Sequence, residues 1–520
     1  MPEQRITMDR TIVDTFRDLA RDRADHPALV CGERSLTYAD LDQRANRVAN
    51  ALLADGLGAG DRVAYLDLNE PEFFEVMLAC LKIGATVAPI NYRLTPKEMG
   101  QIVADAQAPV LVLGHRFEQL TEPLQQAAPG LRRTVVTGEA YEAWVAGHDA
   151  TDPGHAGGPD DVILQLYTSG TTGLPKGVLI TNANCSALLE VAQEWSVDES
   201  SVCLVAMPLF HIGGSGWAMV GLARGATDVL VPVPDPAGLL DLVEEQQVTN
   251  AFLVPAVLQM MAAVPGADER SFPSLRSIAY GASPITPAVL RRSLEVLKAP
   301  LYQVYGLTET TGAITQLSAD DHDPGGPREH LLRSAGRAYP WVELKAVDPV
   351  TGEDAAPGEV GEIFIRSVQV TPGYWNKPDD TKQAIDEDRW LHTGDAGYVD
   401  DEGYVFLTDR IKDMIVSGAE NVYPIEVETV LAEHPDVADV AVVGVPDEKW
   451  GETVKAVVVR CEGSAVTEEA LLEHGRQHLA GFKRPRSVDF VDELPRNPSG
   501  KLLKRVLREP YWADQGDRRI

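Results

Sequence analysis

The sequence predicts an α/β protein with a large N-terminal domain of parallel-rich sheets packed with helices, followed by a small α+β domain. Three observations predict this fold class. The chain has 520 residues, more than one hydrophobic core usually supports, so at least two domains are expected. Strand-like and helix-like segments alternate through the first half, as they do where helices join parallel strands. The pattern changes after Asp409, so we predict domains at residues 1–410 and 411–520.

The elements of the first half follow from their caps and hydrophobic patterns. Thr37 is expected to cap a helix that begins at Tyr38, with Asp40 as the partner in a capping box. Pro71 begins a second helix, which ends near Gly84. Buried strands are expected at residues 62–68, 86–89, around 111, and at 162–166, 202–207, 226–231 and 277–280.

The C-terminal module is expected to mix helices and strands at residues 424–434, 438–445, 453–459, 467–478 and 487–491. Its last part carries an unusual charge. Between Gly481 and Arg508 stand eight basic residues and three acidic ones. The run either offsets acidic neighbours on a solvated face or forms an anion-binding site.

Composition disfavours several classes of protein. The chain has 46 Lys and Arg against 78 Asp and Glu, a net charge of −32 that would repel nucleic acid. The longest apolar stretch, residues 73–90, is interrupted by Glu75 and Lys82, so no membrane-spanning segment is expected. The first ten residues lack the apolar core of a signal peptide, and the five cysteines are dispersed. These features predict a cytoplasmic protein with reduced thiols.

Residues 167–177, Tyr-Thr-Ser-Gly-Thr-Thr-Gly-Leu-Pro-Lys-Gly, directly follow a predicted buried strand. The glycines let backbone amides turn toward an anion, the hydroxyls can donate to phosphate oxygens, and Lys176 adds a positive charge. The order differs from that of a Walker A loop, because Pro175 precedes the lysine and Gly177 follows it. The segment therefore predicts a phosphate-binding loop of another kind.

This loop resembles the phosphate-binding signature of the adenylate-forming superfamily, which includes acyl-CoA synthetases, peptide-synthetase adenylation domains and luciferases. Further segments resemble the superfamily's other motifs in order: YGLTET at 305–310, HTGD at 392–395, DRIKDMI at 409–415, SGAEN at 417–421 and PRNPSGK at 495–501. The resemblance spans nearly the whole chain and is strongest to bacterial fatty-acid–CoA ligases. It implies a β-barrel-like subdomain in the large domain and a mobile C-terminal domain.

The resemblance implies two reactions in one site. A carboxylate attacks the α-phosphate of ATP and releases pyrophosphate, and the thiol of CoA then displaces AMP. A carboxylate is already ionised at neutral pH, so the first reaction needs alignment and charge neutralisation rather than a general base. Mg²⁺ is the implied cofactor, with ATP and CoA as co-substrates.

The roles of individual residues are carried over from the superfamily's motifs. The ATP-binding residues are expected to be Thr168, Ser169, Gly170, Thr171, Thr172, Gly173, Lys176, Gly281, Ala282, Ser283, Tyr305, Gly306, Asp395 and Arg410. The expected catalytic residues are Lys501, Thr308, Glu309 and His211. Glu309 would ligate magnesium, because a hard cation prefers carboxylate oxygen. Lys501 would bridge the substrate carboxylate and the α-phosphate.

The same motifs imply a hinge and a binding site for the thiol substrate. Lys412 is the expected hinge residue, about which the C-terminal domain rotates after adenylation. The expected CoA-binding residues are Gly418, Trp450, Phe482, Arg484 and Arg486. Relatives often carry a second glycine where this chain has Ala419, so the tunnel contact is assigned to Gly418 alone. Trp450 fits an ordinary packing role equally well.

The acid is predicted from the expected acyl pocket, at residues 210–217, 254, 280–283 and 302–304. His211 occupies the position at which amino-acid adenylation domains carry an aspartate, so amino acids are disfavoured. The pocket segments contain no Lys or Arg, which disfavours a diacid. His211 either gates the pocket or is an ordinary neutral histidine.

We therefore predict an acyl-CoA synthetase for a medium- or long-chain fatty acid. Two alternatives stay open: a CoA ligase for an aryl or branched acid, and a stand-alone acyl-AMP ligase that delivers to a carrier-protein thiol. The expected partners are the acid, ATP and CoA, without nucleic acid, and a homodimer stays open.

Overall fold

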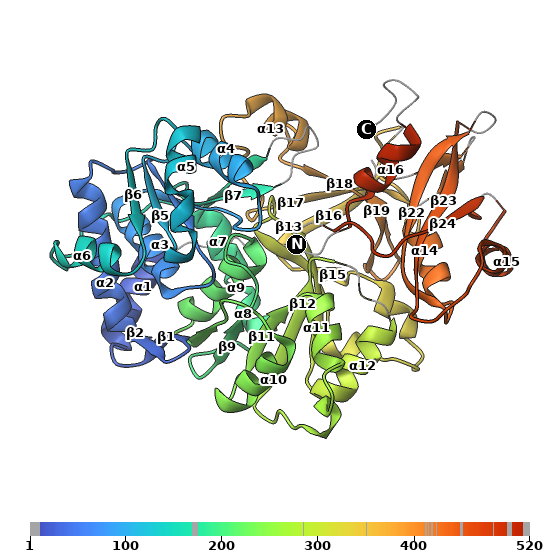
Figure 1. Cartoon of the computed structure of the whole chain (residues 1–520), viewed down its shortest axis with the longest axis horizontal. Coiled ribbons are helices and arrows are strands. Elements are labelled where there is room, and N and C mark those ends of the chain that lie inside the picture. The colour runs from blue at the N-terminus through green and yellow to red at the C-terminus, as the bar shows by residue number, and fades with distance from the viewer. Residues whose placement is uncertain are drawn as a thin grey trace. The chain divides into compact units, whose positions relative to one another are not determined.

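The computed structural model describes residues 11–168, 175–283, 285, 287–349, 351–410, 413, 415–417, 420–422, 424–447, 451–481, 483–496 and 502–512 (Figure 1). Contacts divide the chain into two compact units. The larger holds the residues up to Glu343 together with Ile365–Leu391, and the smaller holds Leu344–Phe364 and His392–Ile520. The α/β fold class predicted from the sequence is confirmed. The predicted domain boundary after residue 410 stays a prediction.

The first sheet of the large unit has six strands in the order β6-β5-β3-β4-β7-β8, and all neighbours are parallel except β7 and β8. Its strands are β3 (Arg62–Leu66), β4 (Thr86–Pro89), β5 (Val110–Leu113), β6 (Arg133–Val136), β7 (Val162–Thr168) and β8 (Lys176–Thr181). The central strands are buried on both faces, which explains their continuous apolar sequence. The antiparallel β7–β8 hairpin brings the two ends of the predicted phosphate loop together.

The second sheet has nine strands in the order β15-β14-β13-β12-β11-β9-β10-β1-β2, with a parallel centre from β13 to β1. Its strands are β1 (Pro27–Cys31), β2 (Arg34–Thr37), β9 (Val202–Val205), β10 (Thr227–Leu230), β11 (Asn250–Leu253), β12 (Ser277–Gly281), β13 (Leu301–Leu307), β14 (Gly312–Leu317) and β15 (Arg337–Ala338). Figure 1 shows α10, α11 and α12 side by side along this sheet, where their apolar faces form one buried cluster with β11 and β12.

Helices of the large unit begin where the sequence supplies caps. Thr37 caps α2 and forms both capping-box bonds with Asp40, and Gly84 ends α3 with a φ of 72°. Both predicted helices are confirmed. The helices of this unit are α1 (Ile12–Asp22), α2 (Tyr38–Ala54), α3 (Pro71–Ile83), α4 (Pro96–Ala106), α5 (Thr121–Ala127), α6 (Glu139–Ala146), α7 (Asn182–Leu188), α8 (Val191–Glu194), α9 (Ile212–Ala223), α10 (Pro236–Glu245), α11 (Pro255–Ala262), α12 (Pro287–Leu297) and α13 (Pro378–Ala384), with 3₁₀ turns at His115–Leu120, Ala267–Glu269, Ala319–Asp321 and Glu329–Arg333.

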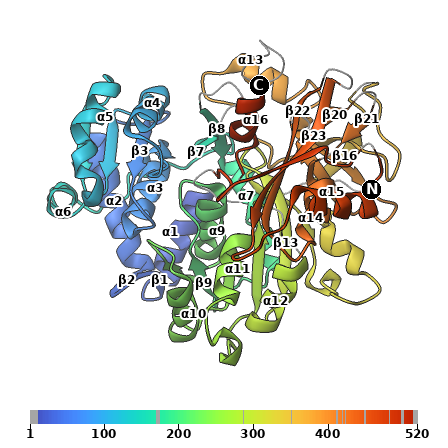
Figure 2. The ribbon, with the colours of Figure 1, turned by 45° about the vertical axis from the view of Figure 1, so that its right-hand side comes forward.

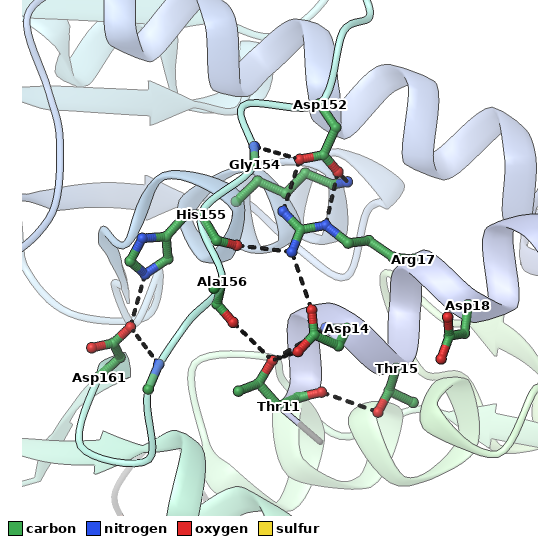
Figure 3. A network of polar contacts seen from close by, with 12 residues as sticks. Thr11, Asp14, Thr15, Arg17, Asp18, Asp152, Gly154, His155, Ala156 and Asp161 are labelled. Atoms are coloured by element: carbon green, nitrogen blue, oxygen red, sulfur yellow. Dashed lines mark hydrogen bonds and ion pairs between the residues drawn. The ribbon is translucent and has the colours of Figure 1, made fainter. Parts of the chain in front are cut away.

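A long connection without regular structure joins α6 to β7, and it is held by a network of polar contacts (Figure 3). Asp152 accepts two hydrogen bonds from the guanidinium of Arg17 on α1, at 2.7 and 2.9 Å. It also receives Nζ of Lys82 on α3 at 2.6 Å. Further along, Nε2 of His155 lies 2.8 Å from Oδ2 of Asp161. These contacts tie the connection to α1 and α3 directly before the hairpin that carries the phosphate loop.

A four-stranded sheet in the order β16-β17-β18-β19 follows: β16 (Val342–Val347), β17 (Gly361–Ser367), β18 (Leu391–Val399) and β19 (Val405–Arg410). It corresponds to the predicted β-barrel-like subdomain. No helix in the described part of the chain is long and apolar enough to cross a membrane.

The C-terminal part of the smaller unit is a five-stranded sheet with a helical layer on each face (Figure 2). Its strands are β20 (Ile415–Ser417), β21 (Glu420–Val422), β22 (Val437–Asp447), β23 (Gly451–Arg460) and β24 (Ser487–Phe490), and its helices are α14 (Pro424–Ala432), α15 (Glu468–His478) and α16 (Lys504–Trp512). Alternate residues of β22 enter different cores, because successive side chains of a strand point to opposite faces. Val440 and Val442 pack with α14 and α15, whereas Ala441 and Val443 pack on the side of α16.

Candidate active site

Most of the predicted site segments of the large unit follow parallel strands of the nine-stranded sheet. β9, β11, β12 and β13 are parallel, so their carboxyl ends share one edge, which is where open α/β sheets bind ligands. Gly281 ends β12 directly opposite Val304 of β13, and Ala282 and Ser283 follow. A Cβ at Gly281 would lie 2.4 Å from the carbonyl oxygen of Val304, so the two strands need a glycine there. The sheet thus brings Gly281–Ser283 beside the segment that carries Tyr305.

The turn between β13 and β14 requires a glycine at position 306 and is held by a hydrogen bond to Thr310. Tyr305 and Gly306 stand at an irregularity in the β13–β14 pairing, and a Cβ at Gly306 would lie 1.9 Å from the carbonyl oxygen of Gly312. Oγ1 of the buried Thr310 accepts a hydrogen bond from the amide of Leu307 at 2.8 Å. The turn therefore presents Thr308 and Glu309, both half-buried, next to Tyr305.

A second segment, residues 369–374, fixes this turn from outside. Nε2 of the buried Gln369 donates to the carbonyl oxygens of Thr310 and Ala313, at 3.3 and 3.1 Å. The amide of Thr371 donates to the carbonyl oxygen of Glu309 at 2.8 Å. The sequence analysis did not single out this segment, because its bonds join residues about sixty positions apart.

The carboxylate of Glu309 accepts a hydrogen bond from the hydroxyl of Tyr374, with 3.1 Å between Oη and Oε1. Nζ of Lys176 lies 5.1 Å from the centre of the same tyrosine ring, within range of a cation–π contact. Lys176 is also ion-paired with Asp380, the third residue of α13. The expected magnesium ligand and the expected phosphate-binding lysine therefore share Tyr374 as a neighbour.

His211 caps α9 with its backbone, and its side chain meets the ring of Phe210 at a centroid distance of 4.4 Å. Nε2 is buried and has no hydrogen-bond partner among the described residues. Burial, with a smaller contribution from the positive charge of Arg93, lowers the pKa of His211 to about 4. The imidazole is therefore neutral at physiological pH.

Buried Asn69 holds the chain segment that leads to His211, a role that no local sequence pattern indicates. Its amide donates to the carbonyl oxygens of Val205 and Met207, and its oxygen accepts from the amide of Leu209. On the same side, the ring of Tyr92 meets Phe210 edge-on at 5.2 Å. The segment before α9 is thus held by polar bonds and lined by aromatic rings.

Two residues of the expected acyl pocket are core residues in the structure. Nε1 of Trp217 donates to the carbonyl oxygen of Leu204 at 2.9 Å, and the hydroxyl of Tyr280 lies 2.9 Å from Nε2 of His322. Both side chains are buried. The lining role of residues 210–217 and 280–283 stays a prediction.

The smaller unit places the two expected ribose-binding residues opposite each other. Asp395 of β18 pairs directly with Arg410 of β19 in the antiparallel ladder. Asp395 is buried, and its amide donates to Oγ1 of Thr393 at 3.0 Å. Several expected site residues lie outside the described residues: Ser169, Gly170, Thr171, Thr172, Gly173, Lys412, Gly418, Trp450, Phe482 and Lys501.

Comparison with known protein families assigns most of the chain. The family model described as AMP-binding enzyme matches residues 16–375, and the model described as AMP-binding enzyme C-terminal domain matches residues 426–501. The chain belongs to the AMP-binding enzyme family. This AMP-binding enzyme is therefore an adenylate-forming, AMP-forming acid–thiol ligase.

Its relatives differ in the acid and in the thiol. A fatty acid–[acyl-carrier-protein] ligase, ScoC of Streptomyces coeruleorubidus, is 42% identical over 513 residues, which cover 97% of each chain. A feruloyl-CoA synthase of an Amycolatopsis species is 39% identical over 485 residues, covering 92% of this chain and 95% of that protein. Among solved structures, ATP-bound MatB from Rhodopseudomonas palustris superimposes with a TM-score of 0.88 at 32% identity, covering 96% of this chain and 99% of that one.

Half of the basic run in the AMP-binding enzyme's C-terminal unit is paired with carboxylates. Four of its cations form ion pairs inside the unit: Lys483 with Glu426, Arg496 with Asp439, Lys504 with Glu428 and Arg508 with Asp413. The guanidinium Nε of Arg484 donates to the carbonyl oxygen of Leu479. Arg486 and Arg505 are exposed. Charge compensation, one of the two readings of this run, therefore accounts for half of its basic residues.

The described residues fit a magnesium ion bound together with the nucleotide rather than in a cage of protein ligands. Among them there is no group of three or more His, Cys, Asp or Glu that could hold a metal ion. Magnesium is commonly held by one or two carboxylates plus substrate phosphates and water. The carboxylate of Glu309, oriented by Tyr374, suits that mode of binding.

Proposed function

We propose that this enzyme adenylates a medium- or long-chain fatty acid and transfers the acyl group to the thiol of CoA. The adenylation of a carboxylic acid by ATP follows from the family, and the acid and the acceptor are the proposal. The relatives support both parts: one acts on a fatty acid, and another makes a CoA thioester.

The observation that carries the choice of acid is the environment of His211. Its ring is neutral, buried and next to Phe210, whose own ring meets that of Tyr92. A neutral imidazole packed on an aromatic ring favours an apolar acyl chain, because it carries no positive charge that could offset the desolvation of a second carboxylate. A neutral side chain at this position can also move aside without breaking an ion pair, which suits a gate to the acyl pocket.

In the proposed adenylation, Lys176 and the loop hydroxyls from Thr168 to Thr172 bind the β- and γ-phosphates. Tyr305 stacks on adenine, Thr308 contacts the α-phosphate, and Asp395 and Arg410 bind the ribose. A magnesium ion held by Glu309 supplies charge neutralisation on the phosphates.

Lys501 aligns the acid with the α-phosphate by pairing with both oxygens as they approach. Rotation about Lys412 then withdraws Lys501 and brings the Gly418 loop to the acyl-adenylate. The thiol attacks the acyl carbon, and AMP leaves with the bonding electron pair.

A panel of acids tests the proposal. The purified enzyme is incubated with ATP, Mg²⁺ and acetate, octanoate, palmitate, benzoate or ferulate, each with and without CoA, and AMP, pyrophosphate and thioester are measured by mass spectrometry. We expect thioester with octanoate or palmitate, and loss of adenylation in Lys501→Ala. Thioester with benzoate or ferulate alone would refute the fatty acid and favour an aryl-acid CoA ligase.

A carrier-protein thiol is the second candidate acceptor, and two observations favour it. The relative that covers 97% of this chain at 42% identity is a fatty acid–[acyl-carrier-protein] ligase. Four of the eight basic residues between Gly481 and Arg508 are already paired with carboxylates, which lowers the positive charge that this run offers to the phosphates of CoA, although Arg484 and Arg486 are not among the four. Adding a phosphopantetheinylated carrier protein to the assay distinguishes the two. Acyl-carrier product without acyl-CoA would replace CoA as the acceptor and leave the adenylation unchanged.

A further inference from the structure

Lys176 has a resident counter-ion. Its ammonium pairs with Oδ1 of Asp380, and the two side chains are only 16% and 29% exposed. Asp380 lies 204 positions along the chain from Lys176. The pair joins the end of the phosphate loop to the first turn of α13, on the side chain that the proposed function assigns to the phosphates of ATP.

The backbone holds this pair in place. Residues 373–375 run beside β8: the amide of Leu179 donates to the carbonyl oxygen of Gly373 at 3.1 Å, and the amide of Trp375 donates to that of Gly177 at 2.8 Å. The amide of Tyr374 donates to Oγ1 of Thr381 at 3.0 Å, which fixes the start of α13 against this strand. Asp380 is therefore positioned beside Lys176 by two elements rather than by a free surface loop.

A carboxylate in this place competes with a polyphosphate. An aspartate paired with the ammonium group offsets its positive charge and occupies one of its N–H donors, so the ammonium binds phosphate oxygens less strongly. The same carboxylate also repels the negative charge of bound ATP. Without nucleotide, the same carboxylate stabilises a lysine that is largely removed from water. The arrangement thus favours the nucleotide-free state over the ATP-bound state.

We propose that Asp380 is an internal counter-ion that ATP must displace from Lys176, so that this aspartate weakens the affinity of the enzyme for ATP. The inference rests on the proposed role of Lys176 in binding the β- and γ-phosphates. It makes Asp380 a residue that sets nucleotide affinity through Lys176, without contact with the reacting atoms.

Calorimetric titration of the full chain with ATP and Mg²⁺, without any acid, tests the inference directly. We expect Asp380→Asn to bind ATP between about three- and tenfold more tightly than the wild type, the range of a partly buried ion pair removed from competition. Asp379→Asn is the matched control. It removes the same charge from the neighbouring, exposed position of α13, so its affinity for ATP should stay within about twofold of the wild type.

Two further titrations separate competition from a general structural effect. AMP lacks the β- and γ-phosphates, so its affinity should be equal in Asp380→Asn and the wild type. In a Lys176→Met background, Asp380→Asn should no longer tighten ATP binding beyond the effect of Asp379→Asn, because the competed cation is gone. The rate of acyl-adenylate formation at limiting ATP should rise in Asp380→Asn alone.

Unchanged or weaker ATP binding by Asp380→Asn would overturn the inference, and weaker binding would show that the aspartate orients the lysine for the nucleotide. Equal tightening toward AMP would overturn it as well. These outcomes differ from failure of the proposed function. If the wild type bound ATP but adenylated no fatty acid, the proposed function would fail while the affinity test still decided the role of Asp380. Absence of ATP binding by the wild type would overturn both.

Discussion

Tyr374 contacts two charged side chains, Glu309 and Lys176, that are both expected to serve the nucleotide site. Its hydroxyl donates to the carboxylate of Glu309, and its ring faces the ammonium of Lys176. Neither contact follows from sequence spacing, since 65 positions separate Tyr374 from Glu309. One residue outside the recognisable motifs thus orients the expected magnesium ligand while it supports the expected phosphate ligand.

Substitution of Tyr374 by phenylalanine should weaken the use of magnesium. The ring and its contact with Lys176 stay, but Glu309 loses the hydrogen bond that orients it, and loss of such an outer contact commonly costs about tenfold in metal affinity. We expect the magnesium concentration for half-maximal adenylation to rise about tenfold, with little change at saturation. Tyr65→Phe is the control, because the buried hydroxyl of Tyr65 has no partner among the described residues. A lower maximal rate with unchanged magnesium dependence would contradict the prediction.

Asp228 is a second residue with an unusual environment. It lies in the core and was not among the predicted site residues. It stands in β10 between β1 and β9, fully buried, and neither carboxylate oxygen has a partner among the described residues. A Cβ at Gly221 of α9 would lie 2.3 Å from Oδ1, so α9 can approach only with a glycine there. Burial raises the pKa of Asp228 well above its usual range, which favours the protonated carboxyl group in the folded protein.

This raised pKa makes stability fall as pH rises. The unfolded chain releases the proton near pH 4, whereas the folded chain keeps it to a higher pH, so between the unfolded and the folded pKa Asp228 costs about 1.4 kcal/mol per pH unit. We expect Asp228→Asn to unfold at higher denaturant concentration than the wild type at about pH 8, with a smaller difference at about pH 5. Tyr38 and Cys203, the titratable neighbours, both have raised pKa values and stay neutral over this range. Equal pH dependence in the two proteins would refute the prediction.

The connection between α6 and β7 shows how an element without regular structure can be fixed. Asp152 accepts hydrogen bonds from Arg17 and from the amide of Gly154 (Figure 3). It also pairs with Lys82, which is 1% exposed and pairs with Asp42 as well. Burial alone would raise the pKa of Asp152, but the hydrogen bonds from Arg17 and Lys82 outweigh it and hold the pKa well below its usual range. The carboxylate is therefore charged, and its stabilising effect is complete above about pH 4.

Removal of that charge should loosen the connection. Asp152→Asn leaves the buried ammonium of Lys82 with one carboxylate instead of two, and breaking a buried pair costs about 3–5 kcal/mol when a charge stays behind. Since Asp42 remains, we expect a loss of about 2–3 kcal/mol in unfolding free energy at neutral pH, and faster proteolysis within residues 149–161. Asp149→Asn, an exposed carboxylate of the same connection, is the control and should change stability by less than about 0.5 kcal/mol. Equal losses in the two variants would contradict the prediction.

Elements with local signals could be predicted from the sequence, and contacts between distant segments could not. Short sequence patterns indicate the Thr37 cap with Asp40 and the helix boundaries at Pro71 and Gly84, and the structure confirms them. The pairing of Lys176 with Asp380 depends on how α13 returns to β8, which no local pattern records. The basic run shows the same limit. Its composition left two interpretations open, and partners on other elements, such as Glu426 and Asp439, favour charge compensation for four of the eight cations.

At the scale of the whole molecule, the net charge of −32 opposes folding and must be set against many individual ion pairs. Several of those pairs join distant parts of a unit, such as Arg44 with Glu75 and Arg17 with Asp152. Buried or bidentate pairs are screened little by salt, whereas repulsion between exposed carboxylates acts over a Debye length. The two contributions therefore respond differently to ionic strength.

Salt should stabilise this protein. Raising NaCl from about 0.01 M to about 0.15 M shortens the Debye length from about 30 Å to about 8 Å, which removes most of the long-range repulsion and leaves the buried pairs intact. We expect the melting temperature to rise by a few degrees over this range and then to level off, as measured by circular dichroism. KCl at equal ionic strength should give the same curve, because screening depends on ionic strength rather than on the identity of the cation. A melting temperature that falls with salt would show that attraction within exposed ion pairs outweighs the net repulsion. The negative net charge would then not lower the stability of the folded protein.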